Sequence, residues 1–377
     1  MILNDICEFI VDCPHTTAPD EGAGYPLIRT PNIGKGRLVL NGVHRVSEKV
    51  YRQRIQRGMP QDNDLIFARE APAGNVAIVK NGEKVCLGQR TVLLRPDKSK
   101  VCPDYLVYYI LAPAQQYKLL GTANGATVAH VNLPVIRNMP VELPPLEVQE
   151  IVAGYLSAYD NLIENNQKQI KLLEEVAQRL YKEWFVDFHF PGYEDTPIVD
   201  GVPEGWERLP VGELIEKIPR TTQIMASEYG KEGPIPIIDQ SREFIAGYTD
   251  NHASLVNVGK PVIVFGDHTR ILKYIQFPFA KGADGTQLIV SNTDRMPQSL
   301  FYCSLVGVDL SNYHYARHFK YLKTEELLVP TQVIAEAFDR FVSPMFSKIQ
   351  RLRDINKAAT NARDRLLPKL MSGEIEV

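Results

Sequence analysis

The same hydrophobic repeat occurs in two separate segments of the chain, and this duplication restricts the fold more than any other feature. In both segments hydrophobic residues recur at alternating steps of four and three, the pattern of a long helix that packs along another helix. The sequence therefore predicts two long helices of the coiled-coil type. The repeat falls on Val152, Leu156, Tyr159, Ile163, Asn166, Ile170, Leu173, Ala177, Leu180 and Trp184, and then on Ile334, Phe338, Phe341, Met345, Lys348, Leu352, Ile355, Ala359, Ala362 and Leu366.

Each repeat contains one polar interruption, Asn166 in the first and Lys348 in the second. A polar residue at such a position costs stability but can fix the register of a helix pair. In an antiparallel pair the two would fall near each other at mid-helix; alternatively, both point into solvent. The sequence leaves these alternatives open. The expected core of the pair comprises Leu156, Ile163, Asn166, Ile170, Leu173, Phe338, Met345, Lys348, Leu352 and Ile355.

Prolines mark the helix boundaries. Pro144 and Pro145 precede the first repeat, and Pro330 precedes the second. Pro344 and Pro368 lie inside the second repeat, and a proline within a helix removes a hydrogen bond and clashes with the preceding turn. We therefore expect the second helix to kink or break at these two positions.

The regions that precede the two helices also correspond to each other. Residues 25–28 (YPLI) match residues 235–238 (IPII), and residues 141–144 (VELP) match residues 327–330 (LLVP). Short β-branched runs between Gly, Pro, Asn and Asp predict strands in both regions. The expected fold is therefore mixed α/β with an internal pseudo-two-fold repeat, made of two lobes with curved sheets. The expected boundaries are a lobe at 1–146, a helix at 147–186, a linker at 187–204, a lobe at 205–330 and a helix at 331–373.

Composition restricts the class of protein. The 377 residues are 44% hydrophobic and 23% charged, enough apolar material for two cores and too much for a disordered chain. The net charge of −3 argues against a uniformly basic nucleic-acid binder but permits one basic face. The five cysteines lack CxxC spacing, which favours buried thiols in a reducing compartment. With no leader pattern and no apolar run of about 20 residues, we expect a cytoplasmic protein without a membrane anchor.

No segment carries a recognisable catalytic motif. Gly259-Lys260 is followed by proline, so it does not form a phosphate-binding loop. His314 and His318 stand four residues apart, but no third metal ligand is evident nearby. We therefore expect a non-catalytic chain that holds no metal and no cofactor of its own.

Polar and basic residues follow or precede the predicted strands at similar places in both regions. Arg can bond to guanine in the major groove, and Gln or Asn can bond to adenine. Each residue alone is a weak candidate, but their recurrence favours DNA binding. The candidates are Arg29, Thr30, Asn32, Lys35, Arg69, Gln89, Arg90, Thr127 and His130 in the first lobe, and Gln240, Arg242, His268, Thr269, Arg270, Lys281, Thr286, Gln287, Tyr313, Tyr315, Arg317, His318 and Lys320 in the second.

Over essentially its whole length, the chain resembles the specificity subunit of type I restriction-modification systems. Four segments carry the resemblance: 143–149 (LPPLEVQ), 180–185 (LYKEWF), 205–206 (GW) and 365–373 (RLLPKLMSG). The resemblance implies two target recognition domains that each bind one half of a bipartite site in double-stranded DNA. It also implies an antiparallel helix pair that sets the spacer between the half-sites.

The resemblance further implies partners. Two methyltransferase subunits would dock on the helices, and restriction (motor) subunits would join them, so S-adenosylmethionine, ATP and Mg²⁺ would bind to the partners. Residues flanking the repeats, such as Tyr155 and Phe346, are expected to need cover from partner helices. Two alternatives remain: a coiled-coil scaffold without DNA specificity, and a stand-alone DNA methyltransferase or nuclease.

Overall fold

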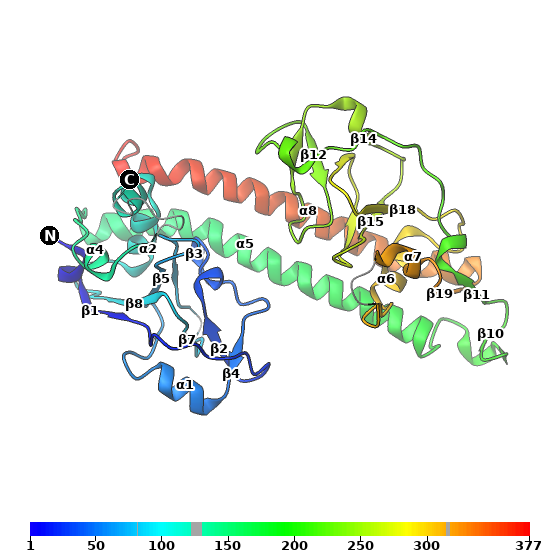
Figure 1. The fold of residues 1–377 in the computed structure, drawn as a ribbon, viewed down its shortest axis with the longest axis horizontal. Helices are drawn as coiled ribbons and strands as arrows, with labels where there is room; N and C mark the ends of the chain where they lie inside the picture. The colour runs from blue at the N-terminus through cyan, green and yellow to red at the C-terminus, as the bar shows by residue number, and fades with distance from the viewer. Residues whose placement is uncertain (81, 122–129, 314–316) are drawn as a thin grey trace. The chain divides into compact units, whose positions relative to one another are not determined.

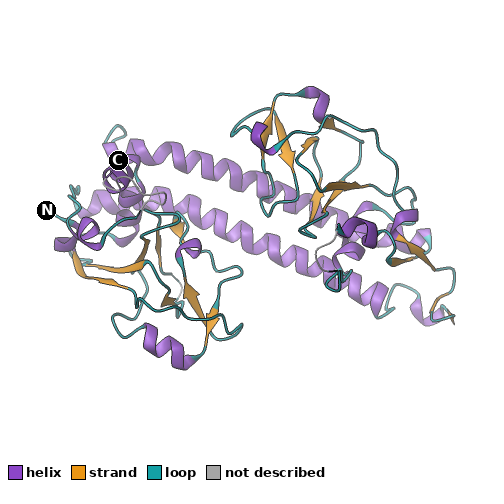
Figure 2. Ribbon diagram, in the orientation of Figure 1, coloured by secondary structure: helices purple, strands orange, loops and turns teal. Residues whose placement is uncertain are grey.

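The computed structural model describes residues 1–80, 82–121, 130–313 and 317–377 (Figure 1). The backbone divides into two compact units, Met1–Asn165 with Ile355–Val377 and Asn166–Asp354. Each unit contains a lobe and a part of both long helices, α5 (Leu146–Tyr181) and α8 (Gln332–Ser372). Both lobes combine strands with short helices, so the predicted mixed α/β class is confirmed (Figure 2).

The lobe of the first unit contains two sheets. One has the strand order β1-β8-β5-β6-β3 and the other the order β4-β2-β7. The strands are β1 (Cys7–Asp12), β2 (Tyr25–Ile28), β3 (Gly36–Arg37), β4 (Arg45–Val46), β5 (Leu65–Ala68), β6 (Val76–Ile78), β7 (Cys86–Leu87) and β8 (Thr91–Pro96). The helices are α1 (Glu48–Arg54), α2 (Pro103–Leu111), α3 (Pro113–Gly121) and α4 (Leu133–Arg137).

The lobe of the second unit is built from a three-stranded sheet, β16-β15-β18, and a four-stranded sheet, β13-β12-β17-β14. Two further strand pairs are β9 with β10 and β11 with β19. The strands are β9 (Ile198–Val199), β10 (Val202–Pro203), β11 (Glu207–Pro210), β12 (Ile235–Ile238), β13 (Gly247–Thr249), β14 (Leu255–Val256), β15 (Val262–Gly266), β16 (Leu272–Ile275), β17 (Phe279–Lys281), β18 (Thr286–Ile289) and β19 (Glu326–Val329). The short helices are α6 (Gln298–Val306) and α7 (His318–Leu322).

Strand pairing confirms the duplication that the sequence predicts. In the first lobe β5 pairs antiparallel with β6 and β8, and in the second β15 pairs antiparallel with β16 and β18. Strand β2 pairs antiparallel with β4 and parallel with β7, just as β12 does with β13 and β17. The two lobes therefore share one pairing scheme, although few of their side chains match.

Both long helices contribute to the hydrophobic core of each unit. In the first unit Val152 and Leu156 of α5 and Leu370 of α8 pack with the buried faces of the sheet and of α2. In the second unit Ala177 of α5 and Phe338 of α8 belong to the core formed by β15 and α6. A lobe can therefore bury its apolar face only when both helices are in place.

Within each unit the two helices pack antiparallel. In the second unit Trp184, in the helical turn that follows α5, contacts Phe341 of α8. Glu174 of α5, ten residues before Trp184, pairs with Arg353, twelve residues after Phe341 on α8. In the first unit Asp160 of α5 pairs with Arg363 of α8. The prediction of an antiparallel pair is thus confirmed for each unit taken separately.

The predicted seam agrees with burial on α5 but not throughout α8. On α5 every predicted seam position is at least partly buried, and Asn166 is only 3% exposed. On α8 the predictions for Phe341 (57% exposed), Lys348 (exposed) and Ile355 (45% exposed) are wrong. The buried hydrophobic positions of α8 are Ile334, Ala335, Phe338, Val342, Phe346, Ile349, Leu352, Ala359 and Leu370.

The error on α8 has a physical cause. This helix packs against the second lobe as well as against α5, so its buried face is wider than a coiled-coil stripe and is displaced from it. Asn166 is buried while Lys348 is exposed, so neither alternative for the two polar interruptions holds for both residues. Phe346, expected to need cover from a partner, is 4% exposed and already covered within this chain.

Helix α8 continues through both of its prolines, so the expected break is absent. Pro344 leaves the carbonyl of Arg340 without its usual helical donor, but both residues are exposed, so water can bond to that carbonyl instead. Helix α5 ends at Tyr181, earlier than the expected residue 186, and a π-helical turn follows over Lys182–Val186. That turn buries Trp184 and Phe185 in the core of the second unit.

Candidate nucleic-acid interface

In the first lobe, the strand ends that carry several candidate residues meet at one edge of the five-stranded sheet. Strand β1 ends at Asp12, β5 ends at Ala68, and β8 begins at Thr91. Because β8 is antiparallel to both neighbours, Asp12 lies close to its start and Ala68 lies opposite Thr91. Arg69, which follows β5, is thereby placed beside Asp12.

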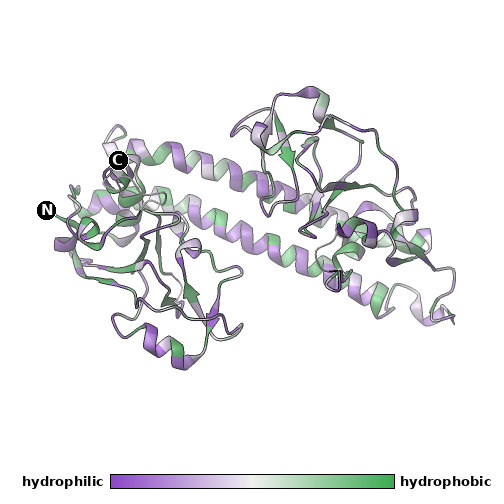
Figure 3. Ribbon diagram, viewed as in Figure 1, coloured by the Kyte–Doolittle hydropathy of each residue, from purple (hydrophilic) through white to green (hydrophobic). Residues whose placement is uncertain are grey.

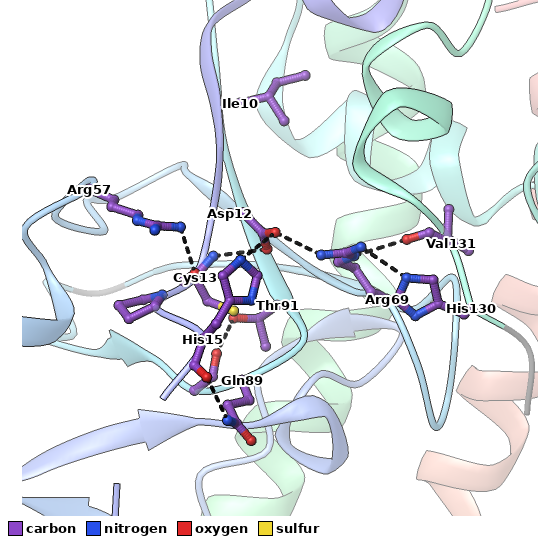
Figure 4. Close-up of polar contacts among 12 residues, drawn as sticks. Ile10, Asp12, Cys13, His15, Arg57, Arg69, Gln89, Thr91, His130 and Val131 are labelled. Carbon is purple, nitrogen blue, oxygen red and sulfur yellow. Dashed lines mark hydrogen bonds and ion pairs between the residues drawn. The ribbon is translucent and has the colours of Figure 1, made fainter. Parts of the chain in front are cut away.

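Arg69 is the centre of this edge (Figure 4). Its guanidinium donates to Asp12 Oδ2 at 2.7 Å and to the Val131 carbonyl at 3.0 Å, and it lies 2.9 Å from His130 Nε2. The Arg69 side chain is only 12% exposed. The structure thus assigns it an internal role, unlike the exposed base or phosphate contact that the sequence suggests, because its donors are already committed.

His130 connects Arg69 to a second acid. Its Nδ1 lies 2.6 Å from Glu70 Oε1. Since the Arg69 guanidinium can only donate, His130 Nε2 accepts from it and Nδ1 donates to Glu70. Glu70 also pairs with Arg90, whose side chain is 63% exposed. The edge therefore alternates acidic and basic groups, and among Asp12, Arg69, Glu70, His130 and Arg90 the side chain of Arg90 is the most exposed.

Three further side chains complete this edge. Gln89 is exposed and donates through Nε2 to the His15 carbonyl at 3.1 Å. His15 is itself 64% exposed and lies 3.4 Å from Asp12 Oδ2. Arg57, exposed, donates to the Cys13 carbonyl at 3.0 Å (Figure 4). Gln89, Arg90, His15 and Arg57 thus offer polar groups to a ligand at this edge.

The candidates at 29–35 divide by burial. Thr30 and Asn32 are 8% and 7% exposed, and Asn32 closes the turn by accepting from the Arg29 amide at 3.1 Å and donating to the Val39 carbonyl at 3.2 Å. Those two predictions are corrected: the Asn32 side chain stabilises a turn, and the Thr30 side chain is buried in it. Lys35 is exposed, and Arg29 is partly buried.

In the second lobe, Gln240 connects two loops. Its Nε2 donates to the Asp284 carbonyl at 2.7 Å, and its Oε1 accepts from the His268 amide at 3.0 Å. Thr269 Oγ1 donates to the Gln240 carbonyl at 2.8 Å. The Gln240 side chain therefore connects the loop at Asp284 to the loop at His268. To contact a base, as predicted, it would have to break both hydrogen bonds.

His318 is the second correction of this kind. It is 6% exposed, and its Nδ1 and Nε2 each lie 2.8 Å from a carbonyl oxygen, of Asp267 and Tyr313 respectively. The Asp267 carboxylate accepts from the Phe319 amide at 2.7 Å. His318 thus holds the start of α7 against the end of β15 and is not available to DNA.

The remaining second-lobe candidates differ in exposure. Thr286 is 1% exposed and donates to the Ala283 carbonyl, so its prediction is also corrected. Tyr313 stacks on Tyr321 with ring centroids 4.0 Å apart, and Lys281 is partly buried, which lowers the pKa of its ammonium. Gln287 is partly buried. The exposed candidates are Arg242, His268, Thr269, Arg270, Arg317 and Lys320. Thr127 and Tyr315 lie outside the described residues.

Three acids that the sequence did not single out as site residues organise both edges: Asp12, Glu70 and Asp267. Each stands within one or two residues of a strand end, next to positions that were recognised. Glu70 directly follows Arg69 at a strand end, and that neighbouring arginine was the available signal for it. Asp12 and Asp267 have no such neighbour, and a search for DNA contacts favours basic and amide residues over acids.

The described residues show no sign of metal or thiol chemistry. No group of three or more His, Cys, Asp or Glu side chains among them is placed to hold a metal ion. Burial raises the pKa of Cys7 and Cys86 to about 12, so both remain protonated thiols at neutral pH. None of the helices in the described part of the chain has a stretch apolar enough to cross a bilayer.

The chain is similar to known proteins of one kind. Residues 1–175 match the model of the type I restriction modification DNA specificity domain. The type I restriction enzyme MjaIX specificity subunit of Methanocaldococcus jannaschii is 25% identical over 94% of this chain and 88% of its own length. The HindI specificity subunit of Haemophilus influenzae is 21% identical over 83% of this chain and 86% of its own.

The fold agrees with this similarity. The crystal structure of a type I restriction-modification S subunit from M. genitalium superposes with a TM-score of 0.58, covering 98% of this chain and 95% of that one at 14% sequence identity. The sequence matches thus extend over both lobes and both long helices. Residues 1–175 thus match the type I restriction modification DNA specificity domain, and the chain is similar to type I specificity subunits over most of its length.

Proposed function

We propose that this chain reads DNA sequence for a type I restriction-modification complex, each lobe binding one half of a two-part site. One observation carries the proposal: a chain similar to type I specificity subunits repeats one strand-pairing scheme in two lobes and places polar loops at the same strand ends in both. Two similar lobes with different loop residues suit two half-sites of different sequence.

The lobes would bind through their exposed loop residues. In the first lobe these are Gln89 and Arg90, and in the second they include His268, Arg270 and Lys320. Arg and Lys neutralise phosphates, and Gln and Arg can bond to base edges. The buried residues Arg69 and His318 would act indirectly, by holding these loops in place.

We further propose that methyltransferase subunits bind to the long helices. On α5, within the first unit, Ile151, Tyr155 and Leu162 are 45%, 55% and 42% exposed at helical spacing. Figure 3 shows hydrophobic stretches recurring along this helix among hydrophilic ones. A helix from a partner would cover this stripe. The chain itself would supply recognition only, with S-adenosylmethionine, ATP and Mg²⁺ bound by the methyltransferase and restriction subunits. A cytoplasmic location remains a prediction.

The two alternatives have less support. A scaffold without DNA specificity does not need two lobes with duplicated polar loops. A stand-alone methyltransferase or nuclease needs a catalytic cluster, and the strand-end clusters described here consist of ion pairs and backbone contacts that hold loops.

The proposal is tested by co-expressing the chain with a methyltransferase subunit and mapping methylated adenines across a genome. We expect one motif with two defined halves and a fixed spacer. Exchanging residues 205–330 for the lobe of another such chain should change only one half, and the matched exchange of residues 1–146 should change only the other. A change in both halves, or in neither, contradicts the proposal.

A further inference from the structure

The helix pair of the first unit contains one buried ion pair that connects three elements. Asp160 of α5 is 3% exposed, and its carboxylate accepts from the Tyr108 hydroxyl of α2 at 2.6 Å and from the Arg363 guanidinium of α8. Gly36 packs against the same carboxylate, where an added Cβ would lie 3.0 Å from Oδ2. The acid is thus enclosed by the lobe and by both helices.

A buried ion pair is weak evidence for stability, because desolvating both charges offsets most of their attraction. Its effect on alternative arrangements is larger, since a carboxylate that stays buried without its cation is strongly unfavourable. The pair therefore disfavours any helix alignment that separates Asp160 from Arg363.

Among alignments related by a slip of one or two helical turns, only the native one places a cationic residue of α8 beside Asp160. A slip of one turn, about 5.4 Å along the helix, would bring Ala359 or Leu367 to the place of Arg363, and a slip of two turns would bring Asn356 or Leu370. None of these side chains is cationic. The aliphatic seam around the pair, by contrast, offers similar packing after a slip of one or two turns.

We propose that Asp160 and Arg363 are positioning residues that fix the register of α5 against α8. Resting on the proposed function, the inference extends to DNA: because the helices set the spacer between the half-sites, these two residues would restrict the complex to one spacer length. The pair thus acts on specificity without touching DNA.

The second unit supplies a matched control. There Glu174 of α5 pairs with Arg353 of α8 at 3.0 Å, but the two side chains are 43% and 28% exposed. Water can solvate both when they separate, so the loss of this pair should leave the register unchanged. Both pairs join the same two helices, and they differ chiefly in burial.

Register is measured by disulfide formation in the full chain, with Ile163→Cys combined in turn with Ala362→Cys, Ala358→Cys or Leu366→Cys. In the native register only the pair with position 362 should form a disulfide efficiently. The double variant Asp160→Leu/Arg363→Leu leaves no buried charge unpaired and should lose stability only through the missing hydrogen bond of the Tyr108 hydroxyl, yet it should form disulfides with a slipped position as well. The control Glu174→Leu/Arg353→Leu should retain the native pattern.

A relocation variant decides the matter if the double leucine variant does not fold. Arg363→Ala combined with Ala359→Arg moves the cation by one turn, and disulfide formation should shift from position 362 toward a slipped position. A native disulfide pattern in either the double leucine or the relocation variant would overturn the proposal.

Methylation mapping of the same variants tests the consequence for DNA. We expect the double leucine variant to methylate motifs with more than one spacer length, with both half-sites unchanged. If the unaltered chain directs no methylation at all, the proposed function fails, while the disulfide experiment still tests the register. Unchanged spacer length together with a slipped disulfide pattern would refute the link between register and spacer.

Discussion

Both lobes contain the same backbone hydrogen bond at the end of the central strand, but different kinds of side chain surround it. In the first, the Val131 amide donates to the Arg69 carbonyl at 2.9 Å, and in the second the His318 amide donates to the Asp267 carbonyl at 2.9 Å. Each contact ties the start of a short helix to the end of the central strand. Around it, the first lobe places a network of ion pairs, whereas the second uses hydrogen bonds of an amide, a hydroxyl, an imidazole and the Asp267 carboxylate. A shared backbone thus permits different side chains at the surface that a ligand would meet.

The largest effect should come from removing the centre of the charged network. Arg69→Ala leaves Asp12 and the Val131 carbonyl without their donor in a place that water hardly reaches, so the free energy of unfolding of the first unit should fall by roughly 3 kcal/mol. Chemical denaturation, monitored by the hydrogen exchange of amides in β1 and β8, measures this loss of stability. Lys35→Ala, at an exposed site, is the control and should change stability by less than about 0.5 kcal/mol. Equal stability of the two variants would show that the network is dispensable.

A smaller effect is expected in the second lobe, where charge matters less than hydrogen bonding. Asp267→Ala removes the acceptor of the Phe319 amide and should lower the free energy of unfolding by about 1–2 kcal/mol. Asp267→Asn retains an oxygen acceptor and should recover most of that loss. The same pair of substitutions at Asp12 should recover little, because Asp12 faces the Arg69 cation. Identical behaviour at the two positions would remove the distinction between the lobes.

The smallest effect concerns the exposed part of the charged network. Glu70→Gln releases Arg90 from its acid and removes one negative charge from the edge, so the affinity for duplex DNA should rise severalfold, by about 1 kcal/mol or less. Binding titrations at several salt concentrations measure this change. Glu216→Gln, which removes an exposed acid paired with Lys260 in the second lobe, serves as a comparison. A fall in affinity for Glu70→Gln would mean that Arg90 needs Glu70 to be positioned for DNA.

The sequence by itself determined the order lobe, helix, lobe, helix, because helical and strand periodicities are local properties of the chain. The hydrophobic repeat on α5 correctly predicted which face of that helix is buried, since its hydrophobic and polar residues lie on opposite faces of the helix. The duplication also predicted which strands of the two lobes correspond, and their pairing agrees. None of these inferences needed a distance between residues far apart in the chain.

Only the tertiary structure decided which polar residues are free. The sequence suggests that Arg69, Asn32 and His318 contact DNA at the surface, yet Arg69 and His318 are enclosed by partners 51 to 62 residues away and Asn32 by its own turn. The buried face of α8 was likewise misplaced, because the lobe packed against it adds a second contact surface that periodicity does not encode. Burial and pairing of a polar side chain depend on which distant segments meet around it, and that is set by the packing of the whole unit.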